Sequence, residues 1–316
     1  MKTENSATKR VVNKFNQLAK DVIKHHFGKA ARRIVHRSSG LTNFVFSVKH
    51  SEGDFVIRIA PEANSINSFT KEQWAQKAAR EAGVPVPEIL EVGLEAISYP
   101  YMISTRVDGI EATHHPERFE ILREMGHHAA AINSIRTSGF GETFDWSENR
   151  LSLNTSYKNY LQNEFRYEEK LKILDKNRML TQKQIKGMRK IFAAAGAASV
   201  HNKPVLNHSD MRLKNVIVNK DGKINGIIDW EGATSNIAPQ WEISLALHDL
   251  GIDGKQHFLD GYGLKPKELT EMMPLVKAFN VANYSSAVSR AAEAKDKKAL
   301  DYFRSRMSGT LDLYSF

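Results

Sequence analysis

The first third of the chain alternates apolar and polar positions in a way that is typical of β-strands. Three such segments, at residues 33–36, 43–49 and 54–59, are separated by the turn sequences Ser38-Ser39-Gly40 and Ser51-Glu52-Gly53. Two further short strands are expected at residues 89–93 and 101–104. The pattern predicts a β-rich region, with an antiparallel sheet, in this part of the chain.

Helical periodicity appears on both sides of this region. Near the N-terminus, apolar residues with i, i+3, i+4 spacing predict an amphipathic helix whose outer face is basic: Val11, Val12, Phe15, Leu18, Ala19, Val22 and Ile23. A second helix is expected over residues 68–82, with Ser68 as its N-cap. From about Pro116 onward helical patterns dominate, and we expect one hairpin to be their only interruption.

That hairpin carries the most informative residues of the chain. The apolar segments 216–218 and 224–228 are joined by Asn219-Lys220-Asp221-Gly222, which contains an Asp-Gly turn signal. Asp210 precedes Asn215 by five residues, and Asp229 follows Asn215 by fourteen. This spacing matches the kinase catalytic loop, in which one Asp faces the acceptor hydroxyl and an Asn and a second Asp hold Mg²⁺. An ordinary hairpin with solvated acids at its ends is the alternative.

Composition limits the class of protein. The 316 residues are 41% hydrophobic and 26% charged, as in ordinary globular proteins, and they include no Cys. A disulfide framework, a thiolate metal site and a cysteine nucleophile are therefore excluded. We expect no membrane span, because no apolar stretch approaches ~20 residues. Together with the lack of a hydrophobic segment of signal-peptide type at the start, this favours a cytoplasmic protein.

The net charge of +9 is concentrated at one end of the chain. Residues 1–37 hold ten Lys and Arg against two acids, a net of +8, which leaves 35 bases against 34 acids elsewhere. The excess therefore belongs to the N-terminal segment, residues 1–37, and not to the hairpin region. We interpret it as a solvated helix face, and contact with nucleic acid or an anionic surface is the alternative.

The sequence around Asp210 and Asp229 resembles the aminoglycoside phosphotransferase family, the small-molecule branch of the kinase-like fold. The resemblance begins with His208-Ser209-Asp210 and Asp229-Trp230-Glu231-Gly232-Ala233 and extends over residues 36 to 262. Within the family, Arg136-Thr137-Ser138-Gly139-Phe140-Gly141 and Trp241-Glu242 resemble the hygromycin B phosphotransferases. The resemblance implies an α+β fold with two lobes. We expect a small N-terminal nucleotide-binding lobe at residues 1–104 and a larger, mainly helical lobe for catalysis and substrate binding at 105–316.

The same resemblance assigns roles in the second lobe. Asp210 is expected to orient the acceptor hydroxyl and take its proton late, because phosphoryl transfer depends mainly on positioning and charge stabilisation. Asn215 and Asp229 would coordinate Mg²⁺. His208 would brace the loop, and Glu242 stands where the family has an Asp that supports it.

The first lobe would supply the nucleotide contacts. Arg58 takes the place of the usual phosphate-contacting Lys, and Glu72 is its expected carboxylate partner, with Glu81 as the competitor. The segment Ser38–Asn43 stands where a kinase has its glycine-rich loop. The residues expected to bind nucleotide are therefore Arg58, Glu72, Ser39, Gly40 and Thr42, with the backbones of Thr105 and Val107 at the hinge.

The acceptor is the least determined part of the function. Residues 229–260 carry six acids (Asp229, Glu231, Glu242, Asp249, Asp253 and Asp260) against the single base Lys255, and Glu164, Glu168 and Glu169 precede them. Such an excess permits a polycationic substrate. We expect a Mg²⁺- and ATP-dependent transfer, with GTP as the alternative donor, to a hydroxyl of an aminoglycoside-like antibiotic or of a housekeeping metabolite such as a sugar, choline or amino alcohol. A nucleotide-binding module without catalysis is the alternative of a different class.

Overall fold

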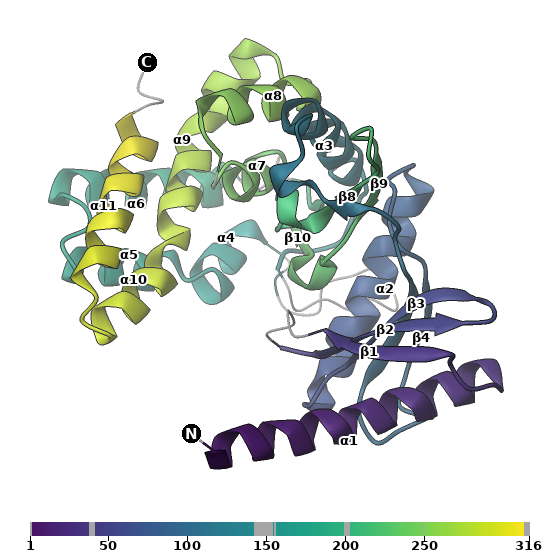
Figure 1. Cartoon of the computed structure of the whole chain (residues 1–316). Coiled ribbons are helices and arrows are strands. Elements are labelled where there is room, and N and C mark those ends of the chain that lie inside the picture. Colours follow the sequence, from purple (N-terminus) through teal and green to yellow (C-terminus); the bar gives the residue numbers. More distant parts are fainter. Residues whose placement is uncertain are drawn as a thin grey trace. The chain divides into compact units, whose positions relative to one another are not determined.

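A computed structural model describes residues 2–37, 42–141, 154, 156–198, 203–248 and 250–312. Its contacts divide the chain into two compact units, Met1–His115 with Lys214–Glu231, and Pro116–Leu213 with Gly232–Phe316. The first unit holds an antiparallel sheet and the second most of the helices, as the α+β assignment predicts (Figure 1). The hairpin after Asp210 thus groups with the sheet, although it lies beyond residue 105. The boundary between the two lobes at residue 105 stays a prediction.

The sheet of the first unit has five antiparallel strands in the order β1-β2-β3-β5-β4. The strands are β1 (Arg33–Arg37), β2 (Phe44–His50), β3 (Gly53–Ile59), β4 (Ile89–Gly93) and β5 (Tyr101–Thr105). On β3, Phe55, Ile57 and Ile59 are buried. Since successive side chains point to opposite faces of a strand, Arg58 stands on the face opposite these apolar residues.

Helix α1 (Lys2–Phe27) closes the core beneath this sheet. It contributes the buried residues Phe15, Ala19, Val22 and Ile23, which share one hydrophobic cluster with strands β2, β3 and β5. Figure 1 shows the helix running alongside the sheet. The apolar stripe is narrower than predicted, because Val11 is 45% exposed.

Helix α2 (Ile66–Glu81) begins two residues before the predicted start at Ser68. The expected N-cap at Ser68 is wrong. A 3-10 turn at Ala63–Ser65 leads directly into the helix, so the chain is already helical before Ser68. Ser65 occupies the capping position without making a side-chain cap bond.

The predicted hairpin is formed by β8 (Val216–Val218) and β9 (Ile224–Ile227), and the short strand β6 (Ile110–Glu111) pairs with β8. Gly109 permits this pairing. Its φ of 136° lies in a region that favours glycine, and a Cβ there would come within 2.2 Å of the Val218 carbonyl oxygen. The chain leaving the sheet is thereby held against the hairpin.

The second unit is mainly helical, but it also contains two short strands that the sequence pattern did not predict. We expected the hairpin alone to interrupt the helices, and this is wrong because β7 (Val205–Asn207) pairs with β10 (Thr234–Asn236). Strands of three residues are too short to show a period of two. The helices are α3 (Arg118–Ile132), α4 (Tyr157–Asn159), α5 (Tyr167–Lys176), α6 (Gln182–Ala197), α7 (Gln240–Ala246), α8 (Ile252–Tyr262), α9 (Pro266–Asn283), α10 (Ser285–Glu293) and α11 (Lys297–Asp312).

Helices α3 and α8 approach each other through glycine. A Cβ on Gly261 would lie 1.9 Å from the Arg123 carbonyl oxygen, and one on Gly126 would lie 2.2 Å from the Phe258 carbonyl oxygen. The two backbones can therefore meet only because both positions lack side chains. No helix in the part of the chain that the structure describes combines the length and apolarity needed for a membrane span.

Candidate active site

Arg58 and Glu72 form a buried ion pair in the first unit. Arg58 Nη1 donates to Glu72 Oε2 at 2.6 Å, and the Glu72 residue is fully buried on α2. Glu81, the competing candidate, lies exposed at the end of the same helix. The structure thus contains the pair that the family resemblance implies. Its role in holding nucleotide stays a prediction.

A second carboxylate, which the sequence did not reveal, also faces Arg58. Glu231 Oε2 accepts from Arg58 Nη2 at 3.3 Å, and the buried Lys71 Nζ donates to the Glu231 backbone oxygen. Burial acts to lower the pKa of Arg58, but attraction to Glu72, Glu231 and Asp229 raises it above its ordinary value. The guanidinium therefore keeps a full positive charge. A fixed, charged fork of this kind suits a phosphate group.

Asn215 and Asp229 are brought together by the hairpin. The Ile228 backbone N–H donates to the Asn215 carbonyl at 2.9 Å, so the residue before Asp229 is tied to Asn215. Asp229 has φ 67°, a left-handed conformation that is uncommon outside glycine and often marks functional positions. The Trp230 indole fixes the turn by donating to the Ile227 carbonyl at 3.0 Å.

The oxygen donors of this pair fit Mg²⁺. One carboxylate and one amide oxygen are hard ligands, and Mg²⁺ usually binds proteins through one or two side chains while water and phosphate complete its shell. Among the described residues, no cluster of three or more His, Cys, Asp or Glu could hold a metal by itself. Asn215 and Asp229 are therefore suited to a nucleotide-bound cation and not to an all-protein cage.

Backbone groups suitable for a nucleobase lie after β5. The Thr105 amide donates to the Glu88 carbonyl at 2.8 Å, so this residue could offer a base only its carbonyl. Among the described residues, no backbone hydrogen bond occupies the amide of Val107. A carbonyl and an amide two residues apart could accept from and donate to one base edge.

The expected phosphate-covering loop can be followed only in part. Ser39 and Gly40 lie outside the described residues. Thr42 is described, and its hydroxyl lies 3.5 Å from Glu231 Oε2. This contact places Thr42 next to the carboxylate that also faces Arg58.

The loop that carries Asp210 belongs to the second unit and follows β7. His208 is fully buried, and its Nδ1 accepts the Asp210 backbone N–H at 3.2 Å. Ser209, between them, has φ 66°. The imidazole thus shapes the loop from within, the bracing role that the resemblance assigns to it, and it is not exposed for chemistry.

Arg212 contacts the proposed catalytic carboxylate. Its Nε donates to Asp210 Oδ1, and its backbone N–H donates to the Asp210 carbonyl at 2.8 Å. This contact restricts the rotation of the Asp210 carboxylate. Arg212 is a site residue that was not predicted, although its place two residues after Asp210 in the sequence was a usable signal.

Glu242 supports the loop from below. Its carboxylate accepts the backbone N–H of His208 at 2.6 Å and that of Ser209 at 3.2 Å. Burial raises the pKa of the Glu242 carboxyl to about 7, although the two amides oppose this shift. The neighbouring Trp241 indole donates to the Ser209 hydroxyl at 3.0 Å. Helix α7 therefore holds the loop with two successive side chains.

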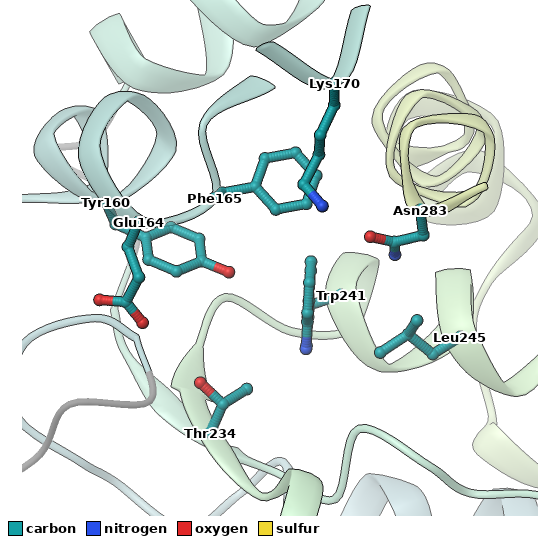
Figure 2. A pocket seen from close by; sticks show the side chains of 8 residues that line it. All are labelled: Tyr160, Glu164, Phe165, Lys170, Thr234, Trp241, Leu245 and Asn283. Carbon is teal, nitrogen blue, oxygen red and sulfur yellow. The ribbon is translucent and has the colours of Figure 1, made fainter. Parts of the chain in front are cut away.

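The acids expected around a polycationic substrate are dispersed. Glu168 pairs with Arg189 and Glu169 with Arg166, whereas Asp253 and Asp260 are exposed on α8. Asp249 lies outside the described residues. Glu164 is one of the acids noted in the sequence, and it lies between α4 and α5 in the chain. Its side chain and that of Trp241 line a pocket of the second unit (Figure 2).

Comparison with known proteins identifies the family and the fold. The model of the phosphotransferase enzyme family, APH, matches residues 33–275. No curated protein sequence matches the chain. A thermostable mutant of aminoglycoside phosphotransferase APH(4)-Ia, solved in ternary complex with AMP-PNP and hygromycin B, is 17% identical, with 92% of this chain and 97% of that one covered and a TM-score of 0.65.

Two further solved structures show the same fold. A GDP complex of a mutant aminoglycoside 2'-phosphotransferase-IIIa is 14% identical, with 95% and 100% of the two chains covered and a TM-score of 0.65. A putative aminoglycoside phosphotransferase from Ralstonia eutropha JMP134 is 16% identical, with 94% and 96% covered and a TM-score of 0.63. At these identities the likeness establishes the kinase-like fold alone.

The fold and the family match define the class of protein as a small-molecule kinase. Because the family model spans most of its length, the chain belongs to the phosphotransferase enzyme family.

Proposed function

We propose that the protein transfers the γ-phosphoryl group of ATP, in a Mg²⁺-dependent reaction, to a hydroxyl of a small molecule. The observation that carries this proposal is the buried pair of Arg58 and Glu72 in the same unit as Asn215 and Asp229. One set of groups can hold phosphate oxygens and the other a divalent cation. Few functions other than nucleotide binding need both.

Each residue has a defined task in the proposed reaction. Arg58 would bind the phosphates, and Thr42 with Ser39 and Gly40 would cover them. Mg²⁺, held by Asn215 and Asp229, would supply positive charge for the phosphate oxygens. Asp210, oriented by His208 and Arg212, would hold the acceptor hydroxyl toward the phosphorus and take its proton late in the transfer.

The hinge would select the nucleotide through the Thr105 carbonyl and the Val107 amide. ATP and GTP remain alternatives, since both present donors and acceptors along one base edge. The solved relatives contain AMP-PNP in one case and GDP in another, which supports a purine nucleotide donor. We keep ATP as the proposed donor and the cytoplasm as the proposed location.

Two acceptor classes fit the family. Hygromycin B is bound by one solved relative, and kanamycin is present in a GDP complex of another, which supports an aminoglycoside-like antibiotic. A hydroxylated metabolite is the second class. A nucleotide-binding module without catalysis is a weaker alternative because every expected catalytic position is filled.

The proposal is tested by coupled ADP release with aminoglycosides, sugars, choline and amino alcohols as acceptors, using two matched variants. Asp210→Ala should lower kcat by several orders of magnitude while the affinity for Mg·ATP stays near that of the parent, because Asp210 serves the acceptor. Asp229→Ala should abolish Mg²⁺-dependent nucleotide binding measured by calorimetry. Nucleotide binding without ADP release on any acceptor would instead support the non-catalytic module.

A further inference from the structure

Lys71 is a buried cation on α2, next to the residues of the proposed nucleotide site. It is 6% exposed, and its Nζ donates to the backbone oxygen of Glu231, two residues after Asp229. Lysine is rarely buried to this extent unless its ammonium has a partner, because burying a charge is costly. Helix α2 and the segment that ends at Glu231 belong to the same unit. The contact therefore ties the helix to the turn that carries the proposed metal ligand.

The turn at Asp229 has a conformation that needs support. Asp229 has φ 67°, and residues other than glycine keep such a conformation where the surrounding structure holds them. On the N-terminal side, the Ile228 N–H donates to the Asn215 carbonyl at 2.9 Å. On the C-terminal side, the Glu231 carbonyl accepts from the Lys71 ammonium. Hydrogen bonds from a charged donor are stronger than those between neutral groups, so Lys71 is a firm attachment on that side.

Lys71 also directly precedes Glu72, which holds the Arg58 guanidinium. Neighbouring residues of a helix point about 100° apart, so α2 contacts β3 with one side chain and the turn after β9 with the other. Burial raises the pKa of the Glu72 carboxyl above its ordinary value, and the positive charges of Arg58 and Lys71 oppose that shift. One helix thus holds both the group suited to phosphate and the turn that carries the group suited to the cation.

We propose that Lys71 is a positioning residue for metal binding, which fixes the Glu231 carbonyl and thereby holds the Asp229 carboxylate in place for a nucleotide-bound Mg²⁺. Lys71 would act through the turn and not on the phosphates, because its ammonium is buried and bound to a backbone oxygen. The inference rests on the proposed function and deepens it, since it makes the metal site depend on the position of α2.

The test measures ATP binding by the full chain in calorimetry, once with Mg²⁺ and once with EDTA. Lys71→Met keeps a long side chain and removes its donor. It should reduce the gain in ATP affinity that Mg²⁺ provides about tenfold, the effect of losing one charge-assisted hydrogen bond, and leave the affinity in EDTA within about twofold of the parent. Lys77→Met is the control, because Lys77 is exposed on the same helix, and it should change neither affinity.

Hydrogen exchange at the backbone amides of residues 229–232 gives a second readout, which needs no ligand. Exchange should be faster in Lys71→Met than in the parent and unchanged in Lys77→Met. Lys71→Gln keeps a shorter, neutral donor and should show the same changes to a smaller degree. This variant decides the question if Lys71→Met does not fold.

Two binding results would overturn the inference. One is a gain from Mg²⁺ that is the same in Lys71→Met and the parent. The other is an equal loss of ATP affinity with Mg²⁺ and with EDTA, which would make Lys71 a phosphate-binding group. A parent that binds no nucleotide would contradict the proposed function instead. Exchange at residues 229–232 would then still decide whether Lys71 holds the turn, and unchanged exchange in both Lys71 variants would overturn the inference.

Discussion

At the residue scale, Arg58 is the side chain on which the electrostatics of the first unit converge. Its guanidinium contacts Glu72 and Glu231 and is also attracted by the negative charge of Asp229. These carboxylates keep Arg58 charged although it is largely buried. If Arg58 binds phosphate and Glu72 steadies it, Arg58→Ala and Glu72→Ala should each lower kcat/KM for ATP. The losses should not add in the double variant, and two groups in contact typically couple by ~0.5–3 kcal/mol.

The controls for this cycle come from the same surroundings. Glu81→Ala removes an acid from the end of α2 and should leave ATP kinetics unchanged. Arg58→Lys should restore part of the function, because an ammonium keeps the charge without the bidentate fork. Strict additivity of Arg58→Ala and Glu72→Ala would show that Glu72 does not act through Arg58.

Glu242 makes a second residue-scale prediction, which concerns pH. Its carboxyl has a pKa of about 7 in the folded protein, against an ordinary value of 4.5. Between these values the folded state binds more protons than the unfolded state, so the free energy of unfolding should fall as pH rises from about 4.5 to about 7. The full effect is on the order of 3 kcal/mol.

Denaturant unfolding at pH 5, 6, 7 and 8 tests this sign. Glu242→Gln removes the ionisation and retains an oxygen for the His208 and Ser209 amides, so its stability should decline less over this interval than that of the parent. A Glu242→Gln protein with the same pH dependence as the parent would assign the titration to another group.

At the scale of elements, the sequence pattern predicted those strands and turns that are determined by neighbouring residues. The strand Ile89–Gly93 has its predicted bounds, and the hairpin of β8 and β9 follows from its Asp-Gly turn. The β7–β10 pair was missed because its two strands are 29 residues apart, counted from Val205 to Thr234, and too short to show alternation. These two strands form only because segments that are distant in the sequence pair with each other.

The site residues likewise include some that were predicted from the sequence and some that were not. The resemblance identified Arg58 and Glu72, whose contact joins a strand to a helix at family positions. Lys71 and Glu231 were missed because their contact uses a backbone oxygen, and such contacts carry no side-chain signature. The pocket around Trp241 was also beyond the sequence, since its lining comes from segments between Tyr160 and Asn283.

The contact between α3 and α8 allows a matched glycine experiment. Gly261→Ala would force a Cβ against the Arg123 backbone and should destabilise the protein by about 1–3 kcal/mol or more. Gly187 is also inside a helix, α6, but a Cβ there meets nothing within 4 Å. Gly187→Ala should therefore stabilise by about 0.5–1 kcal/mol. Thermal unfolding of both variants measures the difference, and a harmless Gly261→Ala would mean that the helices can separate easily.

At the scale of the whole molecule, helix α1 carries part of the excess of basic residues and also contributes residues to the apolar core. Helix α1 exposes Lys20 and Lys24 while it buries Phe15, Ala19, Val22 and Ile23 under the sheet. Deleting residues 1–37 would remove core and charge together. A nucleic-acid role is therefore better tested with Lys20→Gln and Lys24→Gln, which should leave kcat unchanged, and salt-dependent nucleic-acid binding that these changes abolish would support such a role.

The same helix gives the last prediction, that α1 is structurally part of the first unit. Phe15 is 4% exposed and stacks on Phe44 of β2 with a centroid distance of 3.7 Å. Phe15→Ala should reduce the free energy of unfolding by about 3–5 kcal/mol, the usual cost of removing a buried aromatic ring. Val11→Ala, a change at a 45% exposed position four residues earlier on the helix, is the control and should stay within about 0.5 kcal/mol of the parent. Chemical denaturation measures both, and equal stabilities would show that α1 is not packed on the sheet in solution.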